Sequence, residues 1–132
     1  MVWSVEMVNA SELLNHAKNI FDHGNGTELE YRNVTRIAYY SMYHRLKDIE
    51  RTLPDPDGFN KNRGSHELVI IKLSYFAEYS FYSEVLKSNK PNRVEADYYL
   101  DRQHNKHKAY KTLRAAEKMF LLLDENTQQE LA

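Results

Sequence analysis

Arg102 and His107 are separated by four residues, and Tyr110 follows three positions later. A guanidinium binds a phosphate through paired hydrogen bonds and stabilises negative charge that develops on it. An imidazole, with a reference pKa near 6.5, can accept and return a proton at neutral pH. The pair therefore has the residue types needed for acid–base chemistry on a phosphodiester. The opposing interpretation is that both are simply exposed residues where a helix begins.

A second pair lies upstream, in the segment Arg93-Val-Glu-Ala-Asp97-Tyr98. Arg93 can again bind a phosphate, but the position five residues on is a tyrosine. A phenol, with a reference pKa near 10, is a poor proton acceptor at pH 7 unless its surroundings perturb it strongly. This segment favours binding over catalysis. Which of the two pairs is functional, Arg93 with Tyr98 or Arg102 with His107, stays open.

Residues 102–118 carry six basic side chains against one acid, Glu117. At helical spacing most of the basic residues fall opposite the apolar positions, so the basic face is expected in solvent. Such a face can bind RNA phosphates without regard to sequence, and neighbouring tyrosines can stack on bases. A solvated helix face or a docking patch for an acidic protein are the alternatives. The predicted RNA-binding residues are Lys106, Lys108, Lys111, Arg114 and Lys118.

A metal cluster is a further alternative for the same region. If one continuous helix covered it, Asp101, His104 and His107 would come near one another. No additional ligand pattern supports this cluster, and the chain has no cysteine. We therefore expect no metal and no other cofactor.

The segments that must position these groups have apolar residues at helical spacing, and the few glycines and prolines separate them. The first predicted helix begins near Ser11, whose hydroxyl is expected to cap it, and stops at Gly24. The second starts at the capping box Thr27-Glu-Leu-Glu30 and ends before Pro54. Its predicted inward face consists of Tyr31, Val34, Ala38, Met42 and Ile49.

A turn-rich loop over residues 53–64 precedes the third predicted helix, which begins at Ser65. Its broad apolar surface predicts a central position in the bundle, and the pattern allows it to continue through Val85 and Leu86. The segment Ser88-Asn-Lys-Pro-Asn92 is expected to break the chain.

The last predicted helix has Asn105 as its cap and is expected to fray after Asp124. Its predicted core stripe consists of Ala109, Leu113, Ala116, Phe120 and Leu123. The periodicity throughout is helical, so the sequence predicts an all-α fold.

A chain of 132 residues, 42% apolar, suits one core. We expect a single domain over 1–132, with its core at about 11–123 and a polar tail at 124–132. The formal net charge of −1 provides no global positive field, so any nucleic-acid site must be local. No apolar run reaches the roughly 20 residues that cross a bilayer, and the start lacks the apolar core of a signal peptide. A cytoplasmic protein without a membrane partner is expected.

In the second predicted helix, Arg36, Tyr40 and His44 recur every four residues, with Tyr39 beside them. We expect the tyrosine rings to be buried and Arg36 to pair with a buried acid, for which Asp97 is the candidate. The Ala-Asp-Tyr segment would then be structural. A polar groove along this stripe is the alternative.

Four motifs, in order, resemble those of HEPN-domain proteins. Arg36-Ile-Ala-Tyr39-Tyr40-Ser-Met-Tyr43-His44 looks like the family's Arg-Ala-Tyr-Tyr-x-x-Phe-His pattern. Gly64-Ser-His66-Glu-Leu68 resembles its His-initiated third helix, and Arg93-Val-Glu-Ala-Asp97-Tyr98 resembles its Arg-x-x-Ala-Asp-Tyr signature. Ala109 and Ala116 fall where its final helix keeps alanines.

This resemblance implies an antiparallel bundle of four to five helices, HEPN-like and usually dimeric. Many members are metal-independent endoribonucleases, toxins or antiviral effectors with an Arg-x4-6-His motif near the dimer interface. The branch with Tyr at position 98 implies instead a noncatalytic adaptor of the toxin–antitoxin or defence type, which binds RNA, a nucleotide or a nucleotidyltransferase-type protein. The alternative is an endoribonuclease that uses Arg102 and His107 and leaves a 2′,3′-cyclic phosphate.

Overall fold

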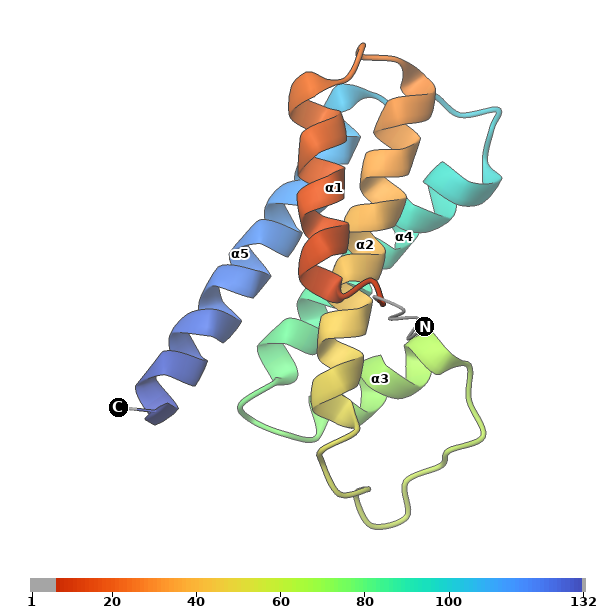
Figure 1. Cartoon of the computed structure of the whole chain (residues 1–132). Coiled ribbons are helices and arrows are strands. Elements are labelled where there is room, and N and C mark those ends of the chain that lie inside the picture. Colours follow the sequence, from red (N-terminus) through yellow and green to blue (C-terminus); the bar gives the residue numbers. More distant parts are fainter. Residues whose placement is uncertain (1–6, 132) are drawn as a thin grey trace, which may run out of the picture.

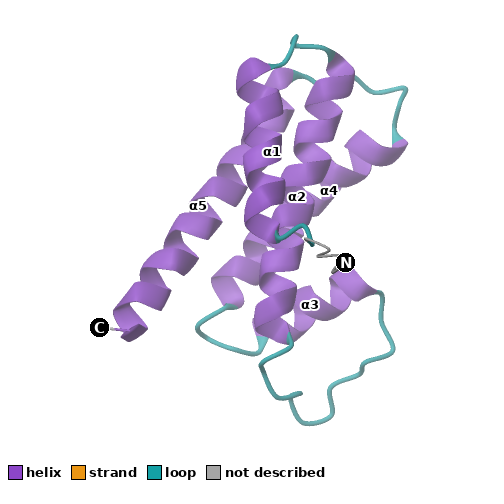
Figure 2. Ribbon diagram, viewed as in Figure 1, coloured by secondary structure: helices purple, strands orange, loops and turns teal. Residues whose placement is uncertain are grey.

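The computed structural model describes the backbone of residues 7–131 and the side chains of residues 7–127. Within that part of the chain every regular element is a helix, and there are no strands (Figures 1 and 2). The predicted all-α class is confirmed. The helices are α1 (Ala10–His23), α2 (Glu28–Glu50), α3 (Ser65–Ser74), α4 (Ser80–Tyr98) and α5 (Lys106–Leu131).

Helix α1 begins one residue before the predicted cap. The side chain of Asn9 accepts a hydrogen bond from the Glu12 N–H at 2.9 Å, so Asn9 is the N-cap and the prediction of Ser11 is wrong. Ser11 already lies inside the helix, because Asn9 has the extended backbone that a cap requires. At α2 the capping box is confirmed, since Thr27 and Glu30 bind each other's backbone N–H.

We predict that Asn9→Ala lowers the free energy of unfolding by about 1 kcal/mol, because the Glu12 N–H loses its acceptor. Ser11→Ala is the matched control, and it should change stability by less than about 0.5 kcal/mol. Urea unfolding followed by circular dichroism measures both. A larger loss for Ser11→Ala would restore Ser11 as the cap.

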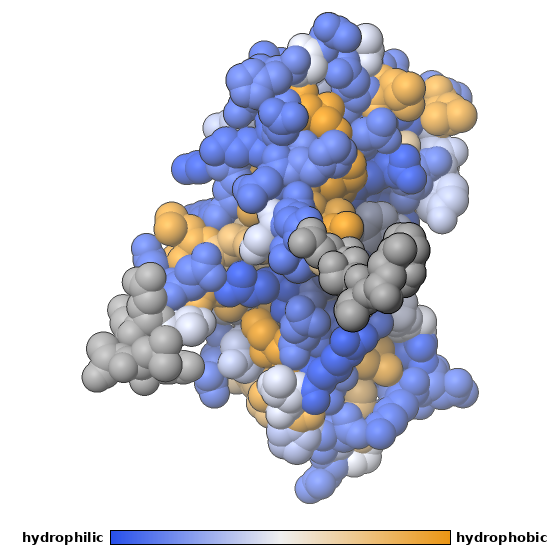
Figure 3. Space-filling model, in the orientation of Figure 1, coloured by the Kyte–Doolittle hydropathy of each residue, from blue (hydrophilic) through white to orange (hydrophobic). Residues whose placement is uncertain are grey.

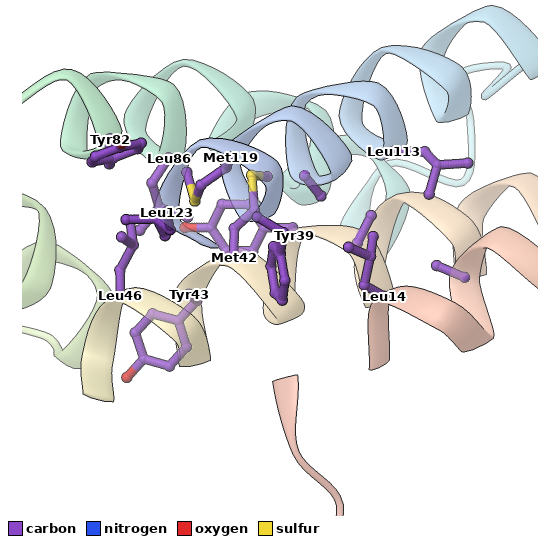
Figure 4. Close-up of a cluster of buried hydrophobic side chains, with 14 of the residues drawn as sticks. Leu14, Tyr39, Met42, Tyr43, Leu46, Tyr82, Leu86, Leu113, Met119 and Leu123 are labelled. Atoms are coloured by element: carbon purple, nitrogen blue, oxygen red, sulfur yellow. The ribbon is translucent and has the colours of Figure 1, made fainter. Parts of the chain in front are cut away.

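Helix α2, rather than α3, is at the centre of the molecule. It contacts all four other helices, whereas α3 contacts only α2 and α4, so the predicted central position of α3 is wrong. Figure 1 shows α1 running antiparallel beside α2, with α5 leaving the bundle toward its C-terminal end. Figure 4 shows Met42 and Leu46 of α2 meeting Leu86, Met119 and Leu123 of α4 and α5. Burying side chains of this size stabilises the fold by about 1.5–3 kcal/mol each.

Helix α4 runs through the segment that was predicted to break the chain. The third helix instead ends at Ser74, a turn follows, and α4 includes Pro91 in its interior. A proline there removes a backbone donor, which disfavours the helix. Side chains on both sides of Pro91 are bonded to α5, since Asn92 Nδ2 donates to the Lys108 carbonyl at 2.7 Å and Asn89 Oδ1 accepts from the Thr112 hydroxyl at 3.2 Å. Tertiary bonds therefore hold α4 together across Pro91.

Helix α5 has the predicted cap, because Asn105 Oδ1 accepts from the Lys108 N–H at 3.0 Å. All five residues of its predicted core stripe are buried. The helix continues past Asp124 to Leu131, and fraying of this polar end stays a prediction.

The face drawn in Figure 3 is largely hydrophilic, with apolar side chains in small groups between the helices. Over the described residues, none of the helices combines the length and apolarity that crossing a membrane requires.

Candidate functional site

Helix α4 and the start of α5 enclose an open groove of about 560 Å³. Both members of the predicted pair, Arg102 and His107, line it. Lys108, Lys111 and the ring of Tyr99 line it too. The structure therefore brings an arginine, a histidine, two lysines and an aromatic ring to one surface hollow. It does so within a single chain.

Arg102 reaches this groove from the loop between α4 and α5. Its guanidinium lies over the Tyr99 ring, 4.3 Å from the centroid, while its backbone N–H donates to the Tyr99 carbonyl at 3.1 Å. The backbone of the loop is thus fixed, and the guanidinium is exposed. His107 is exposed in the first turn of α5. Both side chains can reach a ligand without rearrangement of the core.

The predicted RNA-binding lysines and arginine differ in whether a nearby carboxylate already binds their positive charge. Lys108 Nζ lies 2.5 Å from Glu95 Oε1, and this bond is the main cause of the lowered pKa of Glu95. Arg114 lies 4.0 Å from Glu117, a distance at which an exposed pair contributes little. Within residues 7–127, Lys111 and Lys118 form no ion pair, so their charges are free to bind an anion.

The other predicted pair is not brought together. The Arg93 side chain is only 9% exposed and binds Asp97 at 3.0 Å, whereas Tyr98 is 71% exposed at the end of α4. Arg93 instead lies over the ring of Tyr39, 5.3 Å from its centroid. Arg93 and Tyr98 thus face different surroundings and share no contact that could make them act on one substrate.

The predicted pairing of Arg36 with Asp97 is confirmed, since Arg36 Nε binds Asp97 Oδ1. Asp97 also accepts from Arg93 Nη1, so one carboxylate joins α2 to α4 and is shared by two guanidiniums. The tyrosines of the stripe are buried as expected: Tyr39 is fully buried and Tyr40 is half-buried. The aspartate of the Ala-Asp-Tyr segment is therefore structural here.

Arg32, which the sequence analysis missed, positions the loop that carries Arg102. Its buried guanidinium donates to the carbonyl oxygens of Ala96 at 3.1 Å and Tyr99 at 3.1 Å, and also to that of Arg102. The Ala96 and Tyr99 carbonyls lie at the C-terminal end of α4, where intrahelical donors run out, and the Arg102 carbonyl lies in the loop that follows. Helical spacing could have predicted that Arg32 is buried, because Arg32 is in phase with the buried stripe Thr35, Tyr39, Met42 and Leu46.

His104 is part of the core rather than of the groove. It is fully buried, its Nε2 lies 2.6 Å from the Thr35 hydroxyl, and its Nδ1 lies 3.1 Å from Glu95. Burial lowers the pKa of His104, against the opposing effect of Glu95. The alternative metal cluster with Asp101 and His107 is not formed, and residues 7–127 contain no other group of potential ligands arranged for a metal.

Comparisons of the chain with protein-family models, with characterised proteins and with solved structures found no significant match.

Proposed function

We propose that this protein is a HEPN-like, single-domain, homodimeric adaptor of the toxin–antitoxin or defence type that binds RNA without cleaving it. The observation that carries the proposal is the groove lined by Arg102, His107, Lys111 and the partly exposed Tyr99. Arginine and lysine bind backbone phosphates, and an aromatic ring can stack on a base. The exposed Arg114 and Lys118 extend the same charge along α5.

One feature favours binding over catalysis. Among residues 7–127 no carboxylate is bonded to the imidazole of His107, and the acid of the groove, Glu95, binds Lys108 and His104. A general base is normally held in place by such a partner.

We predict that Lys111→Glu with Arg114→Glu weakens RNA binding by at least about tenfold at low salt. Because two phosphate contacts are lost, the slope of log K against log salt should become shallower by about 1.4 for single-stranded RNA. Fluorescence anisotropy with a labelled oligonucleotide at several salt concentrations measures both quantities.

The matched control is Lys18→Glu with Arg51→Glu, which makes the same change in net charge on exposed positions of α1 and the α2 terminus. This control should keep most of the affinity and the original salt slope. Equal weakening in the two double variants would mean that net charge, and not the α5 face, governs binding.

A metal-independent endoribonuclease is the second candidate, because Arg102 and His107 do line one groove. In that reaction the guanidinium stabilises the phosphate charge while the imidazole takes the proton of the 2′-hydroxyl, whose oxygen attacks the adjacent phosphorus. The bond from phosphorus to the 5′-oxygen breaks, and the leaving oxygen takes a proton from water. The product is a 2′,3′-cyclic phosphate.

If the protein cleaves RNA in the presence of a chelator, His107→Ala should lower the rate by about 10²–10⁴-fold, the usual contribution of a general acid–base. His16→Ala, an exposed histidine of α1, is the control and should leave the rate unchanged. Circular dichroism checks that both variants are folded. Cleavage that persists in His107→Ala would exclude the imidazole from the reaction, and absence of cleavage by the natural protein supports the adaptor.

A further inference from the structure

His66 is enclosed by three tyrosines of α2, on the side of the molecule where α2, α3 and α4 meet. Its ring stacks on Tyr43 with centroids 4.0 Å apart and on Tyr39 with centroids 5.6 Å apart. Tyr40 meets it edge-on at 5.7 Å. We call these four rings, together with Arg93, the His66 cluster. The tyrosines hold the imidazole in one orientation at the start of α3.

The surroundings of this cluster are positively charged. Burial is the largest cause of the lowered pKa of His66, and the positive charges of Arg93 and Lys90 are the next causes. Lys90 precedes Arg93 by three residues in α4, so the two cations lie on the same side of that helix. Lys47 Nζ lies 5.6 Å from the centroid of the Tyr43 ring.

The acids nearby are already engaged. Asp97 is shared between Arg93 and Arg36, while Glu67, the residue after His66, lies 3.4 Å from Arg63. Lys90 and Lys47 form no ion pair within residues 7–127. The cluster thus has an excess of positive charge that no described carboxylate neutralises.

Arg93 provides the first of three donors that lack an acceptor. The Arg93 side chain is more than nine-tenths buried. Its Nε is buried with it and has no hydrogen-bond partner among the described residues. A buried N–H without an acceptor costs about 1–3 kcal/mol, so such a group in a natural protein indicates a missing partner.

The other two donors come from α3. The helix starts after Gly64, which provides no side-chain cap, so the N–H groups of its first turn have no side-chain acceptor. The Tyr39 hydroxyl lies 3.3 Å from His66 Nδ1, and Tyr39 donates this bond in the tautomer whose proton is on His66 Nε2. In that tautomer the Nε2–H group has no acceptor among the described residues.

We propose that the His66 cluster and the first turn of α3 bind a tetrahedral oxyanion of the phosphate class, with Lys90 at its rim. Such an ion accepts hydrogen bonds from several directions, and helix N-termini beside arginines favour it. The site is separate from the groove of the proposed function, because Asn92 and Glu95 of α4 face α5 whereas Arg93 faces the tyrosines of α2.

Titration with inorganic phosphate tests the proposed oxyanion site. The phosphate is added to the full chain in a phosphate-free buffer, at constant chloride and pH. Nitrogen-15 NMR should show saturable shifts of the His66 imidazole and the Arg93 Nε–H signals. Lys90→Gln should weaken phosphate binding by about five- to tenfold, because one cation at the rim is lost. Lys87→Gln is the control, since Lys87 is an exposed lysine of the same helix and is not among the charges that shift His66; it should leave the affinity unchanged.

Arg93→Lys keeps the charge and removes Nε, but it changes a buried group and could unfold the protein, so Lys90→Gln is the deciding variant. Absence of saturable shifts, or equal affinity in Lys90→Gln and Lys87→Gln, would overturn the site. Competition with 5′-phosphorylated and 5′-hydroxyl oligonucleotides identifies the source of the anion. Displacement by the phosphorylated strand alone supports a phosphate monoester as ligand, and displacement by neither supports the free ion.

Discussion

Replacing Arg32 with methionine should lower the free energy of unfolding by about 3–5 kcal/mol, the usual cost of removing one partner from a buried charged network. Arg32 is 5% exposed, and its guanidinium donates to the carbonyls of Glu95, Ala96, Tyr99 and Arg102 while binding Glu28 at 2.8 Å. Methionine fills most of the volume but donates nothing. The carbonyl of Ala96, which is buried, then loses its only side-chain donor.

The same substitution should also reduce RNA affinity, because the Arg32 bonds fix the loop that presents Tyr99 and Arg102. Arg51→Met is the control: its side chain is 64% exposed, and the change should alter stability by less than about 0.5 kcal/mol. Urea unfolding and anisotropy on the same samples provide the two measurements. If Arg32→Met proves as stable as Arg51→Met, the carbonyls must be satisfied by water and the role given to Arg32 is wrong.

The second large effect is expected from Lys72→Met, with a loss of about 3 kcal/mol at pH 7. Lys72 is 3% exposed, and its Nζ donates to the backbone carbonyls of Glu50 at 3.1 Å and Leu53 at 3.0 Å. It also binds the carboxylates of Glu50 at 3.1 Å and Asp55 at 3.0 Å. One buried ammonium therefore closes the C-terminal end of α2 and holds the start of the following loop.

The pH dependence of this effect has a defined sign. Burial alone would lower the pKa of Lys72, but the bonds to Asp55 and Glu50 outweigh it and raise the pKa. A group with a raised pKa in the folded state stabilises fully below its unfolded pKa, about 10.4 for lysine, and loses that contribution as the pH rises through the folded value. The stability difference between the natural protein and Lys72→Met should thus be constant near neutrality and shrink as the pH rises through the folded pKa of Lys72.

Lys61→Met is the matched control, because Lys61 also binds Asp55, at 2.6 Å, but its side chain is 68% exposed. An exposed pair of this kind contributes less than about 1 kcal/mol. Guanidinium unfolding of both variants at several pH values measures the difference. Equal losses in Lys61→Met and Lys72→Met would show that burial of the ammonium is not what makes the contact strong.

Local patterns were enough to predict the helices whose ends carry their own signals. The capping box at Thr27 and the cap at Asn105 formed as expected, because each bond joins residues three positions apart. The same reasoning chose Ser11 over Asn9, since both residue types cap helices well and the choice depends on the backbone of the preceding loop. It also placed a break at Pro91, where bonds from Asn92 to α5 keep α4 continuous.

Part of the candidate site could also be predicted from the sequence. The spacing of Arg102 and His107, the basic face of α5 and the pairing of Arg36 with Asp97 follow from helical periodicity and charge. His104 and Lys72 could not be assigned this way, because each is polar by type and is buried only through partners distant in the chain, Thr35 for His104 and Glu50 for Lys72.

The sequence by itself determined the helical class, the centres of α1, α2 and α5 and the side of α5 that carries positive charge, because these depend on contacts within a few turns. The tertiary structure alone decided which helix is central, that α4 continues through Pro91, and that Arg93 and Tyr98 face apart while Arg102 and His107 share a groove. The reason is physical: burial of a polar group and the direction of a side chain at a helix end depend on donors and acceptors that arrive from other helices.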